Sequence, residues 1–216
     1  MKFLDTIKIA KLTVQLTLFS LLIFIIFINP LFNKEWYPYL YSSSFTVLLI
    51  TSIFTLRKGR TRALKYGVII LLSFWITIIF NLGILNIIAD IVISVFFILL
   101  VIRFLTQVAQ SKEVNVSVIL ESISGYLMMG LLLSYLTIIV LFFFPGSLVF
   151  PEVTDPKLAD IVYFTFVTMS TLGYGDVLPI LPITRSLSIF TSISGQIYLA
   201  VIIAMLVGKY SSQRSI

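Results

Sequence analysis

The chain contains no cysteine and no histidine among its 216 residues, and only 11% of its residues are charged. Without cysteine there are no disulfides and no thiol chemistry, and without histidine there are no imidazole metal ligands. Soluble domains carry about 25% charged residues. The low charge, the 59% hydrophobic residues and the mean hydropathy of +1.12 therefore indicate an integral membrane protein. An enzyme is disfavoured, because a chain without His and Cys, whose acidic residues lie mostly at the membrane edges, cannot build a pair of nucleophile and base or a metal site.

Six segments are apolar and near the length of about 20 residues that a spanning helix needs. They cover residues 12–30, 39–56, 65–82, 86–105, 118–144 and 185–208. Little chain remains for a soluble domain, and seven residues follow Lys209. We therefore expect an all-α, multi-pass membrane protein with no soluble ligand-binding domain in this chain.

The basic residues support six crossings and a cytoplasmic N-terminus, because cytoplasmic loops are enriched in Lys and Arg. With that orientation, 12 of the 15 basic residues fall inside. Lys34, Lys157 and Arg185 fall outside. The basic cluster from Arg57 to Lys65 is also compatible with anionic lipid or nucleic acid, but we interpret it as a topology determinant and expect no nucleic acid partner.

The stretch from Thr168 to Asp176 is a polar run with two glycines in a chain that is otherwise membrane-soluble. A dehydrated cation needs rings of oxygen atoms in place of its water, and backbone carbonyls hold it weakly enough to let it leave. For successive carbonyls to face one side, alternate residues must adopt left-handed backbone angles. Glycine adopts these without a Cβ penalty, which explains Gly173 and Gly175. A Gly-Tyr-Gly-Asp turn in an ordinary loop is the alternative.

The six residues Thr171 to Asp176 resemble the signature of potassium channels, Thr-Val-Gly-Tyr-Gly-Asp, at five of six positions, with Leu172 in place of valine. From residue 118 onward, the order of spanning helix, short helix, filter and spanning helix resembles the two-helix pore module of that family. The resemblance implies K⁺ ligands from Thr171, Leu172, Gly173 and Tyr174, with Gly175 completing the filter. It also implies that Asp176 lies at the outer mouth, held by Tyr163.

The resemblance further implies that Tyr174 packs against Tyr163, Phe164 and Phe166 of the short helix. The alternative is that these three aromatic side chains face lipid and have no role in the filter. Some family members carry a glutamate at the position of Val167, which pairs with the filter aspartate and promotes slow closure. Valine cannot form this pair, so we expect weaker inactivation by that route. Leu172 leaves the stiffness of the filter open.

A re-entrant pore helix is expected over residues 157–170, with Thr154 or Asp155 as its cap and Pro156 near its first turn. Its negative C-terminal end then faces the membrane centre and favours a cation there. Irregular backbone at this depth must be buried in protein or line water. Because one chain supplies one filter strand, we expect a cyclic homotetramer.

The last helix aligns without a gap to simple bacterial pores of this family, which places a hinge candidate at Gly195. A glycine that permits close helix packing is the alternative. The same spacing assigns cavity-lining and gate positions on one helical face, with Ser170 at the roof of the cavity. These positions are Gln196, Leu199, Ile203, Ala204 and Val207. An apolar ring among them could close by dewetting.

The first four helices, residues 1–117, resemble the sensor part of voltage-gated channels, but the fourth lacks regularly spaced arginines. It carries Asp90 near one end and Arg103 near the other. Voltage sensing needs several basic residues within the field, so we expect a domain that does not sense voltage. Glu121, at the start of the fifth helix, is expected to be solvated at the headgroups, and pairing with a basic linker residue is the alternative.

Together, these patterns predict two parts: a four-helix transmembrane domain over residues 1–117 and a pore domain over residues 118–216. The pore domain comprises an outer helix 118–144, the pore helix 157–170, the filter 171–176 and an inner helix 185–208. The expected function is passive, selective K⁺ conduction across the plasma membrane with both termini cytoplasmic and no organic cofactor. A potassium uptake subunit and a nonconducting regulatory subunit are the alternatives, and a single complete filter disfavours both.

Overall fold

The computed structural model describes residues 2–32, 37–56, 60–80, 83–111, 113–150 and 158–214. Seven α-helices account for most of these residues, with one pair of two-residue strands. The elements are α1 (Lys2–Ile23), a π-helical turn (Phe24–Ile28), a 3₁₀ turn (Asn29–Leu31), α2 (Tyr37–Thr55), α3 (Arg60–Phe80), α4 (Gly83–Gln110), α5 (Val116–Phe143), β1 (Leu148–Val149), α6 (Leu158–Met169), β2 (Leu178–Pro179) and α7 (Pro182–Arg214).

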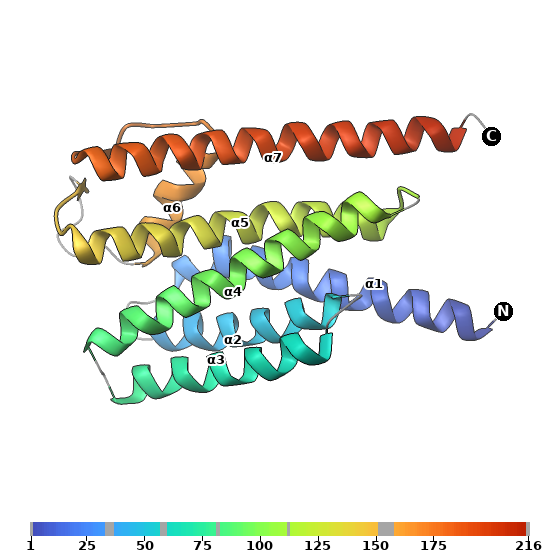
Figure 1. Ribbon diagram of the computed structural model, residues 1–216, viewed down its shortest axis with the longest axis horizontal. Helices are drawn as coiled ribbons and strands as arrows, with labels where there is room; N and C mark the ends of the chain where they lie inside the picture. The colour runs from blue at the N-terminus through green and yellow to red at the C-terminus, as the bar shows by residue number, and fades with distance from the viewer. Residues whose placement is uncertain are drawn as a thin grey trace.

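The long helices lie side by side along the longest axis, whereas the short helix α6 crosses between α5 and α7 in the half farther from the chain ends (Figure 1). The N- and C-termini lie at the same end of the bundle (Figure 1). This arrangement is the one that an even number of crossings produces.

Four helices in the described part of the chain are long and apolar enough to span a membrane. They are Leu12–Leu31, Ile91–Gln110, Val116–Phe143 and Pro182–Gln213. The apolar stretch of α2 is shorter, Ser42–Thr55. The structure therefore supports a multi-pass membrane protein with four candidate spans, and the six-crossing topology stays a prediction.

The helices extend beyond several of the predicted boundaries. The inner helix was expected over 185–208 and runs over Pro182–Arg214, and the fourth was expected over 86–105 and runs over Gly83–Gln110. Hydropathy marks only the part of a helix that suits lipid, and the backbone hydrogen bonds continue into polar sequence. The predicted cap of α6 at residues 154–156 lies outside the described residues.

The outer helix α5 is the centre of the fold and contacts α1, α4, α6 and α7. It begins at Asn115, whose side chain accepts a hydrogen bond from the Val118 backbone amide at 3.1 Å and so caps the helix. Phe45 of α2, Phe97 of α4 and Tyr135 of α5 form an aromatic cluster with ring centroids 5.3–6.3 Å apart. One hydrophobic core therefore joins the two predicted parts of the chain.

Candidate ion-conducting site

The loop that follows α6 folds back onto the C-terminal end of that helix. The backbone amides of Leu172 and Gly173 donate to the Val167 carbonyl at 3.0 and 3.3 Å, and the Thr171 amide donates to Thr168 at 3.0 Å. The hydroxyl of Ser170 also donates to the Val167 carbonyl, at 3.2 Å. Helix ends leave carbonyls without partners; here residues after α6 satisfy three of them, since the Ser170 amide also donates to the Phe166 carbonyl at 2.9 Å. These hydrogen bonds fix the start of the loop against α6.

Left-handed backbone angles alternate along this loop. Thr171 has φ +62°, Gly173 φ +54° and Gly175 φ +80°. Alternation of left-handed and ordinary angles turns successive peptide planes so that their carbonyls face one side. A Cβ at Gly173 or Gly175 would meet no atom within 4 Å, so the backbone angle, and not crowding within the chain, accounts for glycine at both positions.

Sequence reasoning missed the left-handed angle at Thr171, which costs a residue with a Cβ about 1–2 kcal/mol. Among the described residues it is the one non-glycine residue with positive φ. Strain of this kind persists where the surroundings over-determine the conformation. The signal that could have revealed it is the spacing of the two glycines: Gly173 and Gly175 are two residues apart, and one further step of two residues leads back to Thr171.

Tyr163 of α6 joins the helix to the end of the loop. Its hydroxyl donates a hydrogen bond to Oδ2 of Asp176 at 2.5 Å, which is the contact that the sequence predicted for this pair. The hydrogen bond to Asp176 raises the pKa of Tyr163 to about 12. The hydroxyl therefore keeps its proton, and remains a donor to Asp176, across the neutral range.

The segment beyond Asp176 is fastened to the turn that follows α5. β2 pairs with β1 in antiparallel register, Leu148 opposite Pro179. The Ser147 carbonyl accepts hydrogen bonds from the Ile180 amide at 2.9 Å and the Thr184 hydroxyl at 2.8 Å. Two-residue strands are too short to show an alternating pattern, so the sequence did not reveal this attachment. The loop is thus held at both ends.

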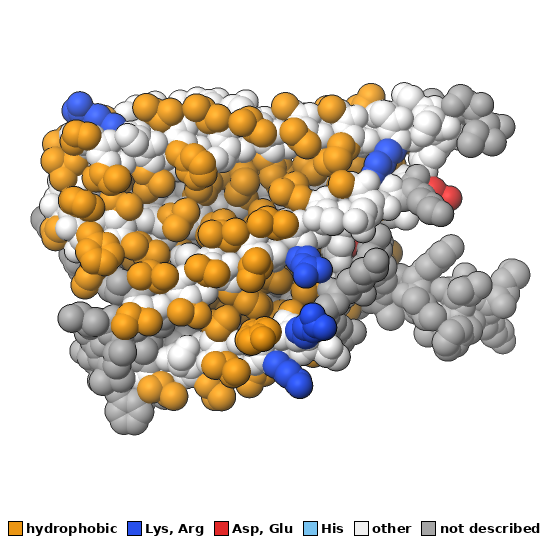
Figure 2. All heavy atoms as spheres, in the orientation of Figure 1, with side chains coloured by type: hydrophobic (Ala, Val, Ile, Leu, Met, Phe, Trp, Pro, Cys, Tyr) orange, Lys and Arg blue, Asp and Glu red, His pale blue; other side chains and the backbone are white. Residues whose placement is uncertain are grey.

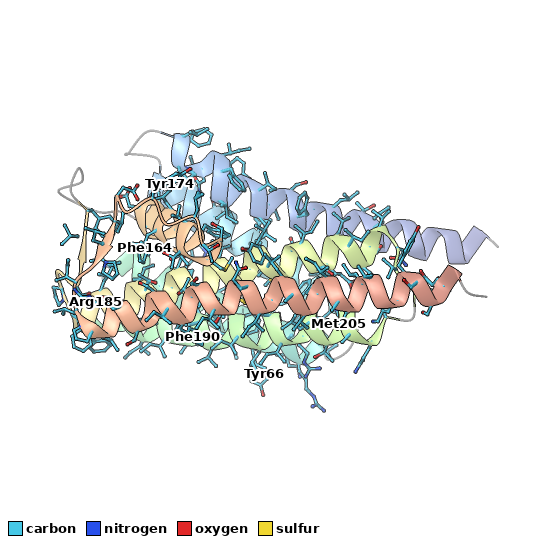
Figure 3. The ribbon with its side chains drawn as sticks, turned by 90° about the horizontal axis from the view of Figure 1, so that it is seen from above. Tyr66, Phe164, Tyr174, Arg185, Phe190 and Met205 are labelled. Atoms are coloured by element: carbon cyan, nitrogen blue, oxygen red, sulfur yellow. The ribbon has the colours of Figure 1, made fainter. Side chains whose placement is uncertain are left out.

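The side chains of Leu172 and Tyr174 are exposed in the single chain, with 56% and 67% of their surfaces accessible; Tyr174 is labelled in Figure 3. Together with Tyr163 and Phe166 they border a cavity of about 500 Å³ that the π-helical and 3₁₀ turns after α1 also line. Phe164 is buried within the chain and does not line this cavity. The predicted packing of Tyr174 against the three aromatics of α6 stays a prediction.

The predicted cavity-lining residues of α7 lie on its exposed side in the single chain. These residues are Gln196, Leu199, Ile203, Ala204 and Val207. Ser170, the predicted roof residue, is exposed as well. The other face of α7 is buried through Thr191, Tyr198 and Ile202.

Gly195 lies where α7 crosses the end of α6. A Cβ at this position would be 2.3 Å from the Met169 carbonyl oxygen and 3.1 Å from its carbon. Backbone atoms cannot move aside as a flexible side chain can, so the close approach of the two helices requires glycine here. α7 is one continuous helix through this residue. The geometry accounts for Gly195 by packing, and the hinge stays a prediction.

Two contacts that the sequence did not reveal bind α7 to the rest of the chain. The Tyr198 hydroxyl donates to the Ser122 carbonyl of α5 at 2.7 Å. Farther along α7, the Lys209 ammonium donates to the carbonyls of Val108 and Ala109, both at 2.7 Å. These two carbonyls belong to the last turn of α4, where a cation is favoured by the helix dipole.

The expected solvation of Glu121 at the headgroups is wrong. Only 1% of its surface is exposed, and its carboxylate accepts a hydrogen bond from the Gln15 side chain of α1. A buried carboxylate needs such a partner because leaving water is costly. This pair contributes a polar contact between α1 and α5. Within the described ranges, no cluster of three or more acidic residues is suited to hold a metal ion.

A comparison with protein-family models matched residues 130–211 to the family described as ion channel. The matched stretch begins within α5 and includes α6, the loop with alternating angles and most of α7. No curated protein and no solved structure matched the chain. Residues 130–211 are thus similar to the ion channel family, whose members carry out transport.

Proposed function

We propose that this chain is one subunit of a homotetrameric, potassium-selective channel that conducts passively across the plasma membrane. The observation that carries the proposal is the alternation of left-handed angles at Thr171, Gly173 and Gly175, directly after the C-terminal end of α6. An ordinary turn needs one or two such residues. Three of them at every second position suit a row of carbonyls that face one axis.

The filter is residues 171–176. K⁺ is held by the hydroxyl and carbonyl of Thr171 and by the carbonyls of Leu172, Gly173 and Tyr174, while Gly175 gives the backbone its final left-handed step. Rings of such oxygens replace the hydration shell of the ion, and several adjacent sites let ions repel one another onward. The C-terminal end of α6 carries a partial negative charge that favours a cation in front of the filter.

A fourfold ring of this loop requires four chains, because the sequence contains one such motif. The exposure of Leu172 and Tyr174 supports association, since irregular backbone at membrane depth is tolerated where protein buries it or where it lines water. A ring of four identical subunits closes with cyclic symmetry. Neighbouring subunits then cover these two side chains.

Below the filter, Ser170 and one exposed face of α7 surround the central water. Gln196 is polar, whereas Leu199, Ile203, Ala204 and Val207 are apolar and form rings in a tetramer. When such rings approach one another, the water between them is expelled and ions no longer pass. The gate is therefore among these rings, and Gly195 is the hinge candidate above them.

The outer mouth is stabilised by the hydrogen bond between Tyr163 and Asp176. Val167 contributes its carbonyl to the start of the loop, and its side chain offers no carboxylate to pair with Asp176. The route to slow closure that such a pair provides is therefore absent from this channel.

Both termini are cytoplasmic in this proposal. Lys and Arg side chains in the described part lie toward the end of the bundle that holds the termini (Figure 2). The exception among them is Arg185, which lies near the start of α7 at the other end (Figure 3). The excess of basic residues on the cytoplasmic side of membrane proteins supports this orientation.

The test is a flux measurement with purified protein in liposomes loaded with K⁺ and diluted into Na⁺ medium. We expect K⁺ efflux that barium blocks, and a particle with the mass of four chains by native mass spectrometry. Empty liposomes with the ionophore valinomycin serve as the positive control. Equal efflux of K⁺ and Na⁺ would identify a nonselective cation channel with a filter relaxed at Leu172, and a monomeric protein would contradict the proposal.

A further inference from the structure

Three basic side chains, Arg62 and Lys65 of α3 and Arg103 of α4, form a basic patch on the outside of the four-helix part, away from the loop and from α7. All three are exposed. Figure 2 shows Lys and Arg side chains over α3 and α4, toward the end that holds the chain termini. The basic patch contributes nothing to the proposed ion pathway, so its role needs a separate account.

Helix geometry brings the three cations to one level. Arg62 and Lys65 are three residues apart, which places them on the same face of α3. α3 and α4 pack against each other and are joined by the short connection at residues 81–82, so they run antiparallel. In such a hairpin the start of α3 lies beside the late part of α4, where Arg103 stands. The basic patch therefore extends across two neighbouring helices.

Among the described side chains, the exposed positions of α3 and α4 that lie beyond the basic patch toward the middle of the bundle are apolar. On α3, Tyr66 and Ile69 follow directly, with 64% and 63% of their surfaces exposed, and Tyr66 points away from the helices (Figure 3). On α4, Leu99 and Ile102 are likewise exposed beside Arg103. A surface of this composition faces lipid chains, which places the cations at the headgroup level.

The basic patch has no carboxylate near it on the helices that carry it, because Asp90, the one acidic residue of α4, lies 13 residues before Arg103. α2 and α3 contain no Asp or Glu, and neither does α4 from Ile91 to Gln110. Cations that only mark the inner side of a membrane protein need not share one level and one face. Three of them above an apolar wall match the chemistry of a phospholipid whose headgroup is an anion and whose acyl chains lie alongside the helices.

We propose that Arg62, Lys65 and Arg103 form a binding site for an anionic phospholipid of the cytoplasmic leaflet. The lipid phosphate lies between the three cations, and its acyl chains lie along the exposed apolar side chains of α3 and α4. The site requires membrane insertion with the termini inside, but it does not depend on potassium selectivity. A failure of one proposal therefore leaves the other standing.

The experiment offers the purified wild-type protein equal amounts of phosphatidylglycerol and phosphatidylcholine with the same acyl chains, and native mass spectrometry records the lipid retained. Each cation near the membrane surface contributes about a fivefold preference for anionic lipid, the equivalent of about 1 kcal/mol. We expect wild type to retain phosphatidylglycerol at least about tenfold better. The variant R62Q/K65Q/R103Q should retain the two lipids about equally.

The matched control, K34Q/K157Q/R185Q, removes three cations that the sequence assigns to the opposite side, and it should keep the wild-type preference. The variant R62K/K65R/R103K keeps the charge and should keep the preference as well. If the triple glutamine variant fails to assemble, R62Q and R103Q are tested singly, each with an expected loss of about fivefold.

An unchanged preference in the glutamine variants, or no preference in wild type, would overturn the proposal and leave the basic patch as a topology determinant. Inorganic phosphate and glycerol 3-phosphate are added as competitors at the concentration of the lipid. We expect neither to displace phosphatidylglycerol, because they lack the acyl chains that lie on the apolar wall. Displacement by either would show a site for soluble phosphate and overturn the assignment to lipid.

Discussion

Single residues set the backbone path of the filter loop. Gly173 and Gly175 could be assigned from the sequence because glycine is the residue that adopts positive φ without a Cβ penalty. Thr171 could not be assigned in this way, since threonine does not favour φ +62° and only the surrounding loop imposes it. The burial of Phe164 was not predictable either, because three aromatics near one another in α6 do not reveal which of them faces the core.

Gly173→Ala should abolish selective K⁺ conduction. Alanine at φ +54° costs about 1–2 kcal/mol in each subunit, which displaces the neighbouring carbonyls. We expect K⁺ flux to fall at least about tenfold. Gly146→Ala is the matched control, because Gly146 also has positive φ and open space around it but lies in the turn after α5. Normal flux in Gly173→Ala would refute the role of this residue.

Tyr163→Phe removes the hydrogen bond to Asp176 and should make the outer mouth less stable, so that current declines faster during continuous recording. Tyr66→Phe, which alters an exposed tyrosine on α3, serves as the control and should behave as wild type. A decline at the wild-type rate in Tyr163→Phe would mean that the hydrogen bond does not support the mouth.

The difference between wild type and Tyr163→Phe should be constant between about pH 7 and 9. The hydrogen bond to Asp176 raises the pKa of Tyr163 from its ordinary value to about 12. The stabilising contribution of the neutral hydroxyl is complete below the ordinary pKa of about 10. It is lost only as the pH rises through 12, so titration of Tyr163 lies outside the range measured.

At the scale of elements, helix positions followed from hydropathy, but contacts between helices did not. Met169 and Gly195 meet across a separation that no local pattern encodes, and the same is true of Gln15 and Glu121. A buried carboxylate and an exposed one look alike in a sequence. The side on which a partner lies depends on how the helices are rotated about their axes.

Gly195→Ala separates packing from hinge. If close packing is the reason for the glycine, the added Cβ forces α7 away from Met169 and lowers the free energy of unfolding by about 1–3 kcal/mol, which thermal unfolding in detergent measures. Gly208→Ala is the control, since a Cβ there meets no atom within 4 Å. Wild-type stability with a reduced open probability would instead favour the hinge.

Lys209→Met tests the contact between the end of α7 and the last turn of α4. A cation at a helix C-terminus contributes about 0.3–2 kcal/mol, so the melting temperature should fall and the end of α7 should become more sensitive to protease. Lys209→Arg keeps the charge and should retain most of the stability. Equal melting temperatures for Lys209→Met and wild type would mean that the contact stabilises nothing.

For the whole molecule, composition and charge predicted a multi-pass membrane protein, and the filter motif predicted a pore in its last two long helices. The ion channel match over residues 130–211 lies in that part of the chain and supports the second prediction. The shared core around Phe45, Phe97 and Tyr135 was not predictable, because it depends on how α2, α4 and α5 come together. The tetramer and the conducted ion stay predictions, since both concern more than one chain.

Potassium selectivity is the central claim, and the reversal potential tests it most directly. Purified protein in a planar bilayer would be recorded with K⁺ on one side and Na⁺ on the other, before and after addition of barium. The alternating filter loop predicts a reversal potential shifted strongly toward the potassium equilibrium potential and a current that barium blocks. A robust current that reverses near zero would contradict the claim, because a pore that does not distinguish K⁺ from Na⁺ is not potassium-selective.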